Sequence, residues 1–287
     1  MKALHIKGLD VIYSNGHKAL ENINLDLETG NICALVGING AGKSTVFKTL
    51  TGGIKPTNGT VLLNGLEVHE ALKKNQVAYV PQNEEVDWSF PILVEDVVMM
   101  GRYGYMGFFR IATKKDHEAV DQALQRVGLS ELRKRQIGEL SGGQKKRVFV
   151  ARALAQDSRI VLLDEPFTGV DVKTEHSLME LFKSLAKDGR LILVSTHNLG
   201  SVPDFCTHAV LLNKSIVSSG PIRTSFTQEN LAIAFGGMLR HLHLKGSDLH
   251  TDADPRTVTV LTDDEGALVL YGDKSHPEIV KKNQDEE

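Results

Sequence analysis

The sequence has little of what marks a membrane-spanning, secreted or nucleic-acid-binding protein. Its strongest apolar runs, among them Leu191 to Val194 and Val97 to Met100, are far shorter than the roughly 20 residues that cross a bilayer. The net charge of −3 gives no basic excess that would attract nucleic acid. Met1 to Ile6 continue into a strand pattern and do not read as a signal peptide. We therefore expect no bilayer span and no nucleic acid partner.

Cysteine is scarce as well. Cys33 and Cys206 are the two cysteines, and their spacing is not that of metal ligands. Cys33 falls inside an apolar run, so we expect a small buried hydrophobe. So few cysteines fit a reducing cytoplasm. A length of 287 residues, with 24% charged and 41% hydrophobic residues, indicates one large domain or a domain with a small appendage.

Glycine, by contrast, is concentrated in one informative stretch, residues 37–45, which matches the P-loop pattern G-x-x-x-x-G-K-[ST]. An apolar run, Ile32 to Val36, precedes it, and a segment able to continue as a helix follows. Glycines let the backbone approach phosphate oxygens, which amide N–H groups and the helix N-terminus then hold. Lys43 can reach the β- and γ-phosphates, and the Ser44 hydroxyl can ligate Mg²⁺. The predicted phosphate-binding residues are Gly37, Asn39, Gly40, Ala41, Gly42, Lys43, Ser44 and Thr45.

Two further apolar strands deliver polar side chains at their carboxyl ends. Residues 160–163 end in Asp164 and Glu165. Beside a P-loop, Asp164 would hold Mg²⁺ and Glu165 could accept a proton from water. Residues 191–195 lead to His197, at the sheet edge where open α/β sheets place ligands. Two acidic residues in a turn and a structural histidine are the plainer alternatives.

Two other positions are ambiguous on their own. Tyr13 is an aromatic at a strand end ahead of the P-loop, and it either stacks on a purine ring or packs as a half-buried strand tyrosine. Ser141 is a good helix N-cap before Gly142 and Gly143. Glycines at a helix N-terminus make an anion-binding site, although an ordinary capped helix has the same sequence pattern.

The remaining pattern alternates between strands and helices. Strands are expected at 3–13, 19–27, 60–63 and 77–80, with a hairpin turn at Asn64-Gly65 and a second hairpin formed by 209–213 and 216–219. Residues 83–139 change to a helical pattern, with helices at 94–101 and 114–127, joined through an aromatic-rich and glycine-rich loop at 101–109. Those aromatics mark a partner surface or a small helical core. A helix is expected to open at residues 140–144 and to run to about 156, and another is expected at 228–236.

Taken together, residues 1–240 resemble an ATP-binding cassette (ABC) ATPase, the nucleotide-binding subunit of an ABC transporter. The most specific feature is Leu140-Ser141-Gly142-Gly143-Gln144, the ABC signature, placed shortly before the strand Ile160 to Asp164. The resemblance implies an α/β P-loop NTPase core with an antiparallel β subdomain and an inserted α-helical subdomain at about 83–157. Residues 241–287 would form a C-terminal appendage, with strands at 257–261 and 267–271 and a disordered tail at 281–287.

The resemblance also implies roles. Tyr13 would stack on adenine, Gln82 would contact Mg²⁺ or the attacking water, and His197 would hold the γ-phosphate. Asp171 matches the loop that crosses the dimer, although Gly169 and Val170 depart from the usual sequence there. Ser141, Gly142, Gly143 and Gln144 would meet the ATP that is bound to a second copy.

The implied partners are a second copy of the chain, which traps ATP between the two, and an integral membrane permease that docks on the helical insertion. Residues 80–91 and 97–104 are similar to ATPases of bacterial importers for manganese, iron or zinc, and we expect manganese or chelated iron. An extracytoplasmic metal-binding protein would feed the permease, and this subunit would sit on the cytoplasmic face of the inner membrane. The alternatives are another importer or exporter substrate, or a soluble ABC ATPase. The signature and Glu165 argue against a P-loop kinase or GTPase.

One further segment lies outside the part of the chain that the resemblance covers. Residues 241–254 are rich in histidine and aspartate, and they either bind a transition metal that regulates activity or form a solvated linker.

Overall fold

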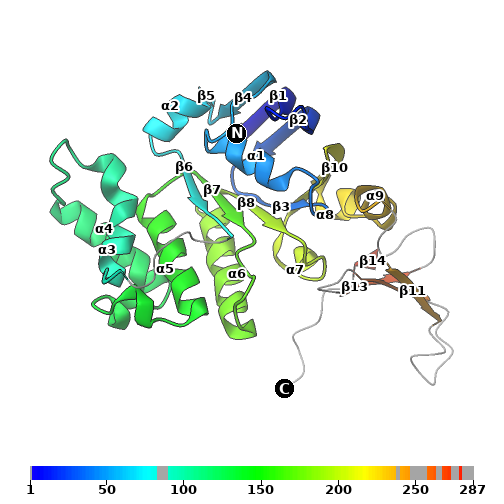
Figure 1. Ribbon diagram of the computed structural model, residues 1–287. Helices are drawn as coiled ribbons and strands as arrows, with labels where there is room; N and C mark the ends of the chain where they lie inside the picture. The colour runs from blue at the N-terminus through cyan, green and yellow to red at the C-terminus, as the bar shows by residue number, and fades with distance from the viewer. Residues whose placement is uncertain are drawn as a thin grey trace.

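The computed structural model describes residues 2–82 and 90–236, and beyond them only the backbone of four strands between 240 and 279. A six-stranded sheet runs through the first part (Figure 1). Its order is β10-β9-β3-β8-β7-β6, and neighbouring strands are parallel except in the β9–β10 hairpin. The strands are β3 (Ile32–Val36), β6 (Val77–Val80), β7 (Ile160–Asp164), β8 (Leu191–Thr196), β9 (His208–Asn213) and β10 (Ser215–Pro221).

Strands β3, β7 and β8 are buried at every residue, because both faces of the sheet are covered. Along β3, Cys33 and Leu35 join one cluster of buried side chains, whereas Ala34 and Val36 join another on the opposite face. Cys33 is fully buried, which raises the pKa of its thiol to about 12. The predicted buried strands and the buried cysteine are confirmed.

An antiparallel sheet, ordered β2-β1-β4-β5, contributes to the first cluster. Helix α1 (Lys43–Leu50) buries Phe47 and Leu50 in the same cluster, so it packs with this sheet. Asn64 and Gly65 have φ values of 50° and 77°, as a tight hairpin turn requires, and the predicted turn is confirmed. The strands are β1 (Lys2–Ile12), β2 (Lys18–Glu28), β4 (Asn58–Leu63) and β5 (Leu66–Glu67).

The helical insertion lies between β6 and β7 in sequence, and Figure 1 shows it to one side of the sheet. Its apolar side chains, including Val98, Leu124 and Phe149, belong to the second cluster, which also contains side chains of the six-stranded sheet. The predicted helices at 94–101 and 114–127 are confirmed. The elements are α3 (Val94–Met99), η1 (Met100–Tyr105), α4 (Lys114–Arg126), η2 (Ser130–Leu132), η3 (Ile137–Glu139) and α5 (Gly142–Ala155).

The predicted loop at 101–109 is wrong in its first half, because Met100–Tyr105 form the 3-10 helix η1. Two contacts fix this turn: the Arg102 guanidinium lies 3.8 Å from the centroid of the Tyr105 ring, and the Tyr105 hydroxyl donates to the Gln156 carbonyl. Helix α6 (Val172–Lys187) was not predicted, although Asp171 is a suitable N-cap for it.

The other helices are short, and the C-terminal strands form their own antiparallel sheet ordered β11-β12-β13-β14. The strands predicted at 257–261 and 267–271 are confirmed, whereas β11 was not expected. The predicted tail at 281–287 lies outside the described residues. Within the described parts of the chain, no helix has the length and apolarity needed to cross a bilayer. The short helices are α2 (Val68–Lys73), α7 (Val202–Phe205), α8 (Ile222–Ser225) and α9 (Gln228–Ala234). The C-terminal strands are β11 (Arg240–Lys245), β12 (Thr257–Thr262), β13 (Ala267–Gly272) and β14 (Glu278–Ile279).

Candidate functional site

The candidate site is built at the carboxyl ends of four adjacent parallel strands. Strand β3 leads into the P-loop at Gly37, β7 ends at Asp164, β8 leads to His197, and β6 leads to Gln82. The register pairs the ends of these strands, because Val36 lies opposite Thr196 and Asp164 lies opposite Ser195. Segments far apart in sequence therefore meet at one edge of the sheet, where α/β folds bind ligands.

Lys43 lies within the P-loop that it belongs to. Its ammonium donates to the carbonyl oxygens of Gly37 at 2.6 Å and of Ile38 at 3.3 Å. The side chain is largely buried, which lowers the pKa of Lys43, while the nearby carboxylates of Glu165 and Asp164 act in the opposite direction. The charge of Lys43 in the P-loop therefore interacts with the charges of Asp164 and Glu165 at the end of β7.

The P-loop glycines are required by packing as well as by phosphate access. A Cβ atom at Gly37 would lie 2.2 Å from the Leu212 carbonyl oxygen of β9. Gly42 has a φ of 104°, and a Cβ there would lie 2.9 Å from the Ala19 carbonyl oxygen. Both loop ends are thus pressed against neighbouring backbone. Of the other predicted phosphate-binding residues, Asn39, Gly40 and Ser44 are exposed, whereas Ala41 and Thr45 are buried.

Asp164 is a buried carboxylate with two hydroxyl partners. The Ser195 hydroxyl donates to Asp164 Oδ1, and the Tyr79 hydroxyl donates to Asp164 Oδ2 at 3.3 Å. Only 9% of the residue is exposed. These hydroxyls fix the orientation of the carboxylate at the strand end, as the coordination of a metal requires.

Both oxygens of the Glu165 carboxylate are engaged. His197 Nδ1 lies 2.8 Å from Oε1, and Gln82 Nε2 donates to Oε2 at 2.8 Å. The Thr168 hydroxyl donates to Oε2 as well, at 3.2 Å. The structure therefore brings together the three residues that the sequence analysis proposed for catalysis, and it adds Thr168.

The backbone of Glu165 has a φ of 48°, which is uncommon for a residue with a side chain. The Glu165 amide donates to the hydroxyl of Ser195 at 3.1 Å and lies 3.2 Å from its carbonyl oxygen. Residues held in this region cluster at functional sites, where the surroundings determine the conformation. Ser195 thus positions both Asp164 and Glu165. Sequence reasoning missed this role, although the residue lies near the end of β8, just before Thr196 and His197.

Tyr13 lies directly after β1 and is partly buried. Its hydroxyl is 3.0 Å from the Thr45 hydroxyl of the P-loop helix, and its ring stacks on His17 at a centroid distance of 6.3 Å. The structure therefore places Tyr13 beside the P-loop.

The signature segment begins α5, on the face of the six-stranded sheet opposite to α1. The Ser141 hydroxyl accepts from the Gln144 amide at 3.3 Å, and the Gln144 side chain accepts from the Ser141 amide at 2.9 Å, which makes a capping box. A Cβ atom at Gly143 would lie 3.6 Å from Asp171 Oδ2. Ser141, Gly142, Gly143, Gln144 and Asp171 therefore gather at the neighbouring starts of α5 and α6, away from the P-loop helix.

The leftover histidine- and aspartate-rich segment, 241–254, has no described side chains, so its predicted metal binding lies outside the described residues. Among the residues that are described, no group of three or more His, Cys, Asp or Glu side chains is arranged to hold a metal ion.

The P-loop follows β3, the Asp164-Glu165 pair lies at the end of β7, and His197 follows β8, which lies between them in the sheet. Together with the signature segment that opens α5, these features are those of a P-loop ATPase of the ATP-binding cassette class. Residues 20–168 match the family model described as ABC transporter, and the chain belongs to this family as an ATP-hydrolysing, ATP-binding subunit. It is 60% identical over 269 residues to the chelated iron transport system membrane protein YfeB of Yersinia pestis, covering 94% of this chain and 91% of that protein.

Three further similarities agree. The manganese transport system ATP-binding protein MntA of Synechocystis sp. is 52% identical over 235 residues, covering 82% of this chain and 90% of that protein. A metal-chelate type ABC transporter solved in an inward-facing conformation superposes with a TM-score of 0.75 at 27% identity, covering 92% of this chain and 99% of that one. A dimeric ATP-binding cassette bound to ADP and Pi superposes with a TM-score of 0.66 at 27% identity, covering 77% and 99%. ATP-binding subunits of this family dimerise and work with a membrane permease.

Proposed function

We propose that two copies of this chain hydrolyse ATP at shared sites and thereby drive a permease that imports a transition metal, manganese or iron in preference to zinc. The observation that carries the catalytic assignment is the Glu165 carboxylate, held at 2.8 Å by both His197 and Gln82 at the edge of the sheet beside the P-loop. The metal is supported by the 60% identity to a chelated iron transport protein and the 52% identity to a manganese transport protein.

Glu165 acts as the general base. It accepts a proton from the water that attacks the γ-phosphorus, and ADP is the leaving group. His197, whose side chain is 26% exposed, holds the γ-phosphate and orients that water. Once the Gln82 side chain leaves Glu165, it would hydrogen-bond the attacking water, or its amide oxygen would coordinate the metal. Tyr13 stacks on the adenine, a role supported by its contact with the P-loop helix.

The polar groups at the site fit Mg²⁺, because the exposed Ser44 hydroxyl, the oriented Asp164 carboxylate and the Gln82 amide are all oxygen donors. When bound, Mg²⁺ would neutralise charge on the β- and γ-phosphates. Lys43 supplies the second positive charge, and the amides of Gly37, Asn39, Gly40, Ala41, Gly42 and Thr45 surround the phosphates.

The signature segment completes the site of the other copy. Ser141, Gly142, Gly143 and Gln144 present a capped helix N-terminus that favours an anion, and it lies across the sheet from the P-loop helix of its own chain. Asp171 sits beside Gly143 and would cross the same dimer contact. ATP therefore joins two copies, and its hydrolysis removes the shared anion.

The permease docks on the helical insertion, on the cytoplasmic face of the inner membrane. Large apolar side chains are exposed there, with Phe108 at 95%, Phe109 at 81% and Ile111 at 74%. Exposed apolar groups of this size mark a partner surface. An extracytoplasmic metal-binding protein delivers the metal to the permease. Phe108→Ser should reduce co-purification with the permease, whereas Ile233→Ser, at a position 61% exposed outside the insertion, should not.

Uptake of labelled Mn²⁺, iron and Zn²⁺ by cells that lack the chain tests the whole proposal. Cells complemented with the wild-type chain should accumulate manganese or iron, and cells complemented with Glu165→Gln should not. Equal uptake of all three metals in both strains would contradict an importer of these metals. ATP-dependent loss of another solute would instead identify an exporter.

A further inference from the structure

Lys146 is a buried lysine on the helix that carries the signature. It lies in the second turn of α5, and only 8% of the residue is exposed. Its ammonium donates to the carbonyl oxygens of Pro81 and Gln82, each at 3.1 Å. A buried ammonium needs such acceptors, so this pair of bonds ties the backbone at Gln82 to the signature helix.

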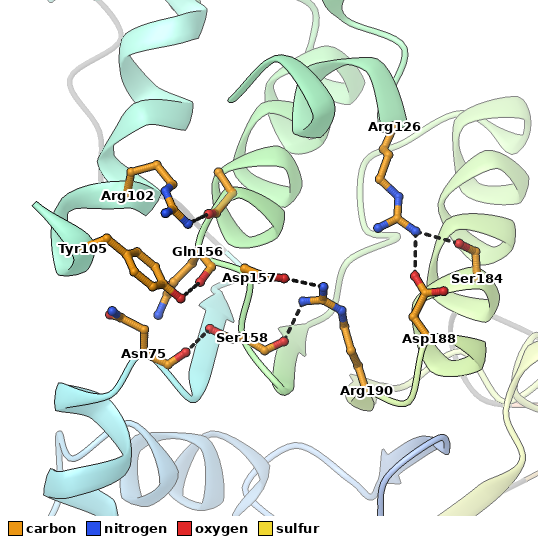
Figure 2. A network of polar contacts seen from close by, with 11 residues as sticks. Asn75, Arg102, Tyr105, Arg126, Gln156, Asp157, Ser158, Ser184, Asp188 and Arg190 are labelled. Atoms are coloured by element: carbon orange, nitrogen blue, oxygen red, sulfur yellow. Dashed lines mark hydrogen bonds and ion pairs between the residues drawn. The ribbon is translucent and has the colours of Figure 1, made fainter. Parts of the chain in front are cut away.

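The opposite end of α5 is fixed to the sheet by a polar network, shown in Figure 2. Gln156, at the C-cap, donates to the Val77 carbonyl at 2.8 Å and accepts from the Tyr105 hydroxyl at 2.8 Å. The Ser158 hydroxyl donates to the Asn75 carbonyl at 2.7 Å.

Two arginines extend this network. Arg190, at the start of β8, binds the Ser158 carbonyl at 2.7 Å and the Asp157 carboxylate at 2.6 Å (Figure 2). Arg102 donates to the Ala155 carbonyl at 2.9 Å. The C-terminal end of α5 is therefore anchored by side chains from several elements.

A helix anchored at one end moves most at the other. Helix α5 has 14 residues and is roughly 20 Å long, and Lys146 lies roughly 13 Å from the anchored end. A tilt of about 10° at the anchor moves Lys146 by roughly 2 Å. That displacement exceeds the tolerance of a hydrogen bond of 2.8 Å, the distance from Gln82 Nε2 to Glu165 Oε2.

We propose that Lys146 is a positioning residue that transmits movement of the signature end of α5 to Gln82, and so to Glu165. This inference rests on the proposed function, in which the signature of one copy binds the ATP held by the other. Engagement of the partner's ATP then moves Lys146, draws Gln82 away from Glu165 and frees the base in its own copy. Lys146 thus links the two nucleotide sites of the dimer.

The test uses the full chain assembled with its permease in liposomes, with turnover measured against ATP concentration and affinity measured with a fluorescent ATP analogue. Lys146→Met should lower kcat about tenfold, bring the Hill coefficient close to 1 and leave ATP affinity within about twofold. Lys146→Arg keeps the donors and should restore most of the turnover. Lys187→Met, at an exposed lysine of α6 outside the insertion, is the matched control and should leave turnover unchanged.

A double-mutant cycle separates positioning from a structural role. Because Lys146 acts through Gln82, Lys146→Met should lower kcat less than about twofold in a Gln82→Ala background. An equal loss in both backgrounds would overturn the inference, as would an unchanged Hill coefficient in the single variant. Should Lys146→Met fail to fold, Lys146→Gln, which is also neutral, is expected to give the same results and is judged by the same criteria.

Glu165→Gln distinguishes this inference from the proposed function. If that variant keeps full turnover, the proposed catalytic site is wrong. If it loses turnover while Lys146→Met keeps both turnover and cooperativity, only the role of Lys146 is wrong.

Discussion

Gln82 donates a hydrogen bond to Glu165 at 2.8 Å, although 83 residues separate the two in sequence. The bond occupies the oxygen of Glu165 that Thr168 also contacts, while His197 occupies the other. A carboxylate with both oxygens engaged is well oriented but has less capacity to accept a proton from water. In the proposed mechanism, activation of the site requires Gln82 to release Glu165.

Replacing Glu165 with glutamine keeps the size of the side chain and removes the base. We expect Glu165→Gln to bind ATP normally and to lower turnover by about 10²–10⁴-fold, the usual contribution of a general base. Steady-state ATPase assays and ATP-analogue binding measure the two effects. Glu131→Gln, at an exposed glutamate of the insertion, should retain full turnover. Full activity in Glu165→Gln would exclude Glu165 as the base.

Replacing Lys43 with methionine should act on binding instead. The buried ammonium lies beside Asp164 and Glu165 and is the cation that would meet the phosphates. We expect Lys43→Met to weaken ATP binding by about 10–100-fold, the worth of hydrogen bonds to a charged group. Lys48→Met, at an exposed position of the same helix, is the control and should bind ATP as the wild type does. Equal affinities for the two variants would contradict a phosphate role for Lys43.

The close approach of Gly37 to β9 predicts a loss of stability. The added methyl group of Gly37→Ala would lie 2.2 Å from the Leu212 carbonyl oxygen, so the backbone must move. Overpacking of this kind lowers the free energy of unfolding by about 1–3 kcal/mol. Urea denaturation measures it, with Gly107→Ala as the control, because nothing lies within 4 Å of a Cβ atom there. Unchanged stability in Gly37→Ala would show that β9 yields without strain.

The Arg102–Asp116 ion pair predicts a pH-dependent contribution. Asp116 accepts from the Thr113 hydroxyl at 2.7 Å, from the Thr113 amide at 2.8 Å and from Arg102 at 3.0 Å, and only 4% of its side chain is exposed. The Thr113 hydroxyl, the Thr113 amide and the Arg102 guanidinium lower the pKa of Asp116 to about 2. We expect Asp116→Asn to lower the free energy of unfolding at pH 7 by about 2–4 kcal/mol.

Because the folded-state pKa of Asp116 lies below the unfolded value of 3.8, its ionised form stabilises the fold above about pH 4. The difference between wild type and Asp116→Asn should therefore shrink as the pH falls towards 2. Chemical denaturation at pH 7 and pH 3 measures this. Asp121→Asn, which breaks an ion pair on the same helix at a side chain 54% exposed, should lower stability by about 1 kcal/mol or less. A pH-independent effect of Asp116→Asn would contradict the assigned cause.

Sequence reasoning succeeded where the signal is local. The apolar run at residues 32–36, the Asn64-Gly65 turn and the helix capped by Ser141 each depend on residues within a few positions of one another. It failed at η1, because that turn is fixed by the contact of Tyr105 with Gln156, 51 residues away.

In the candidate site, too, local signals could be predicted from the sequence and long-range contacts could not. The motifs identified the residues, since the catalytic ones follow strand ends and the signature ones start a helix. The bonds among the catalytic residues, however, join side chains that follow separate strands. Lys146 was missed because a lysine in a helix is normally a solvated residue, and only the folded structure brings it to the Pro81 and Gln82 carbonyls.

Cys33 and Cys206 are both free thiols, buried in the core, and burial raises the pKa of each. A thiol that is both inaccessible and protonated reacts slowly with maleimides and similar reagents. The folded chain therefore behaves as a cysteine-free background for site-specific labelling. Spectroscopic probes attached at single introduced cysteines, one near the start of α5 and one on the P-loop side of the sheet, would report the distance between the two halves of the nucleotide site without any change to the native core.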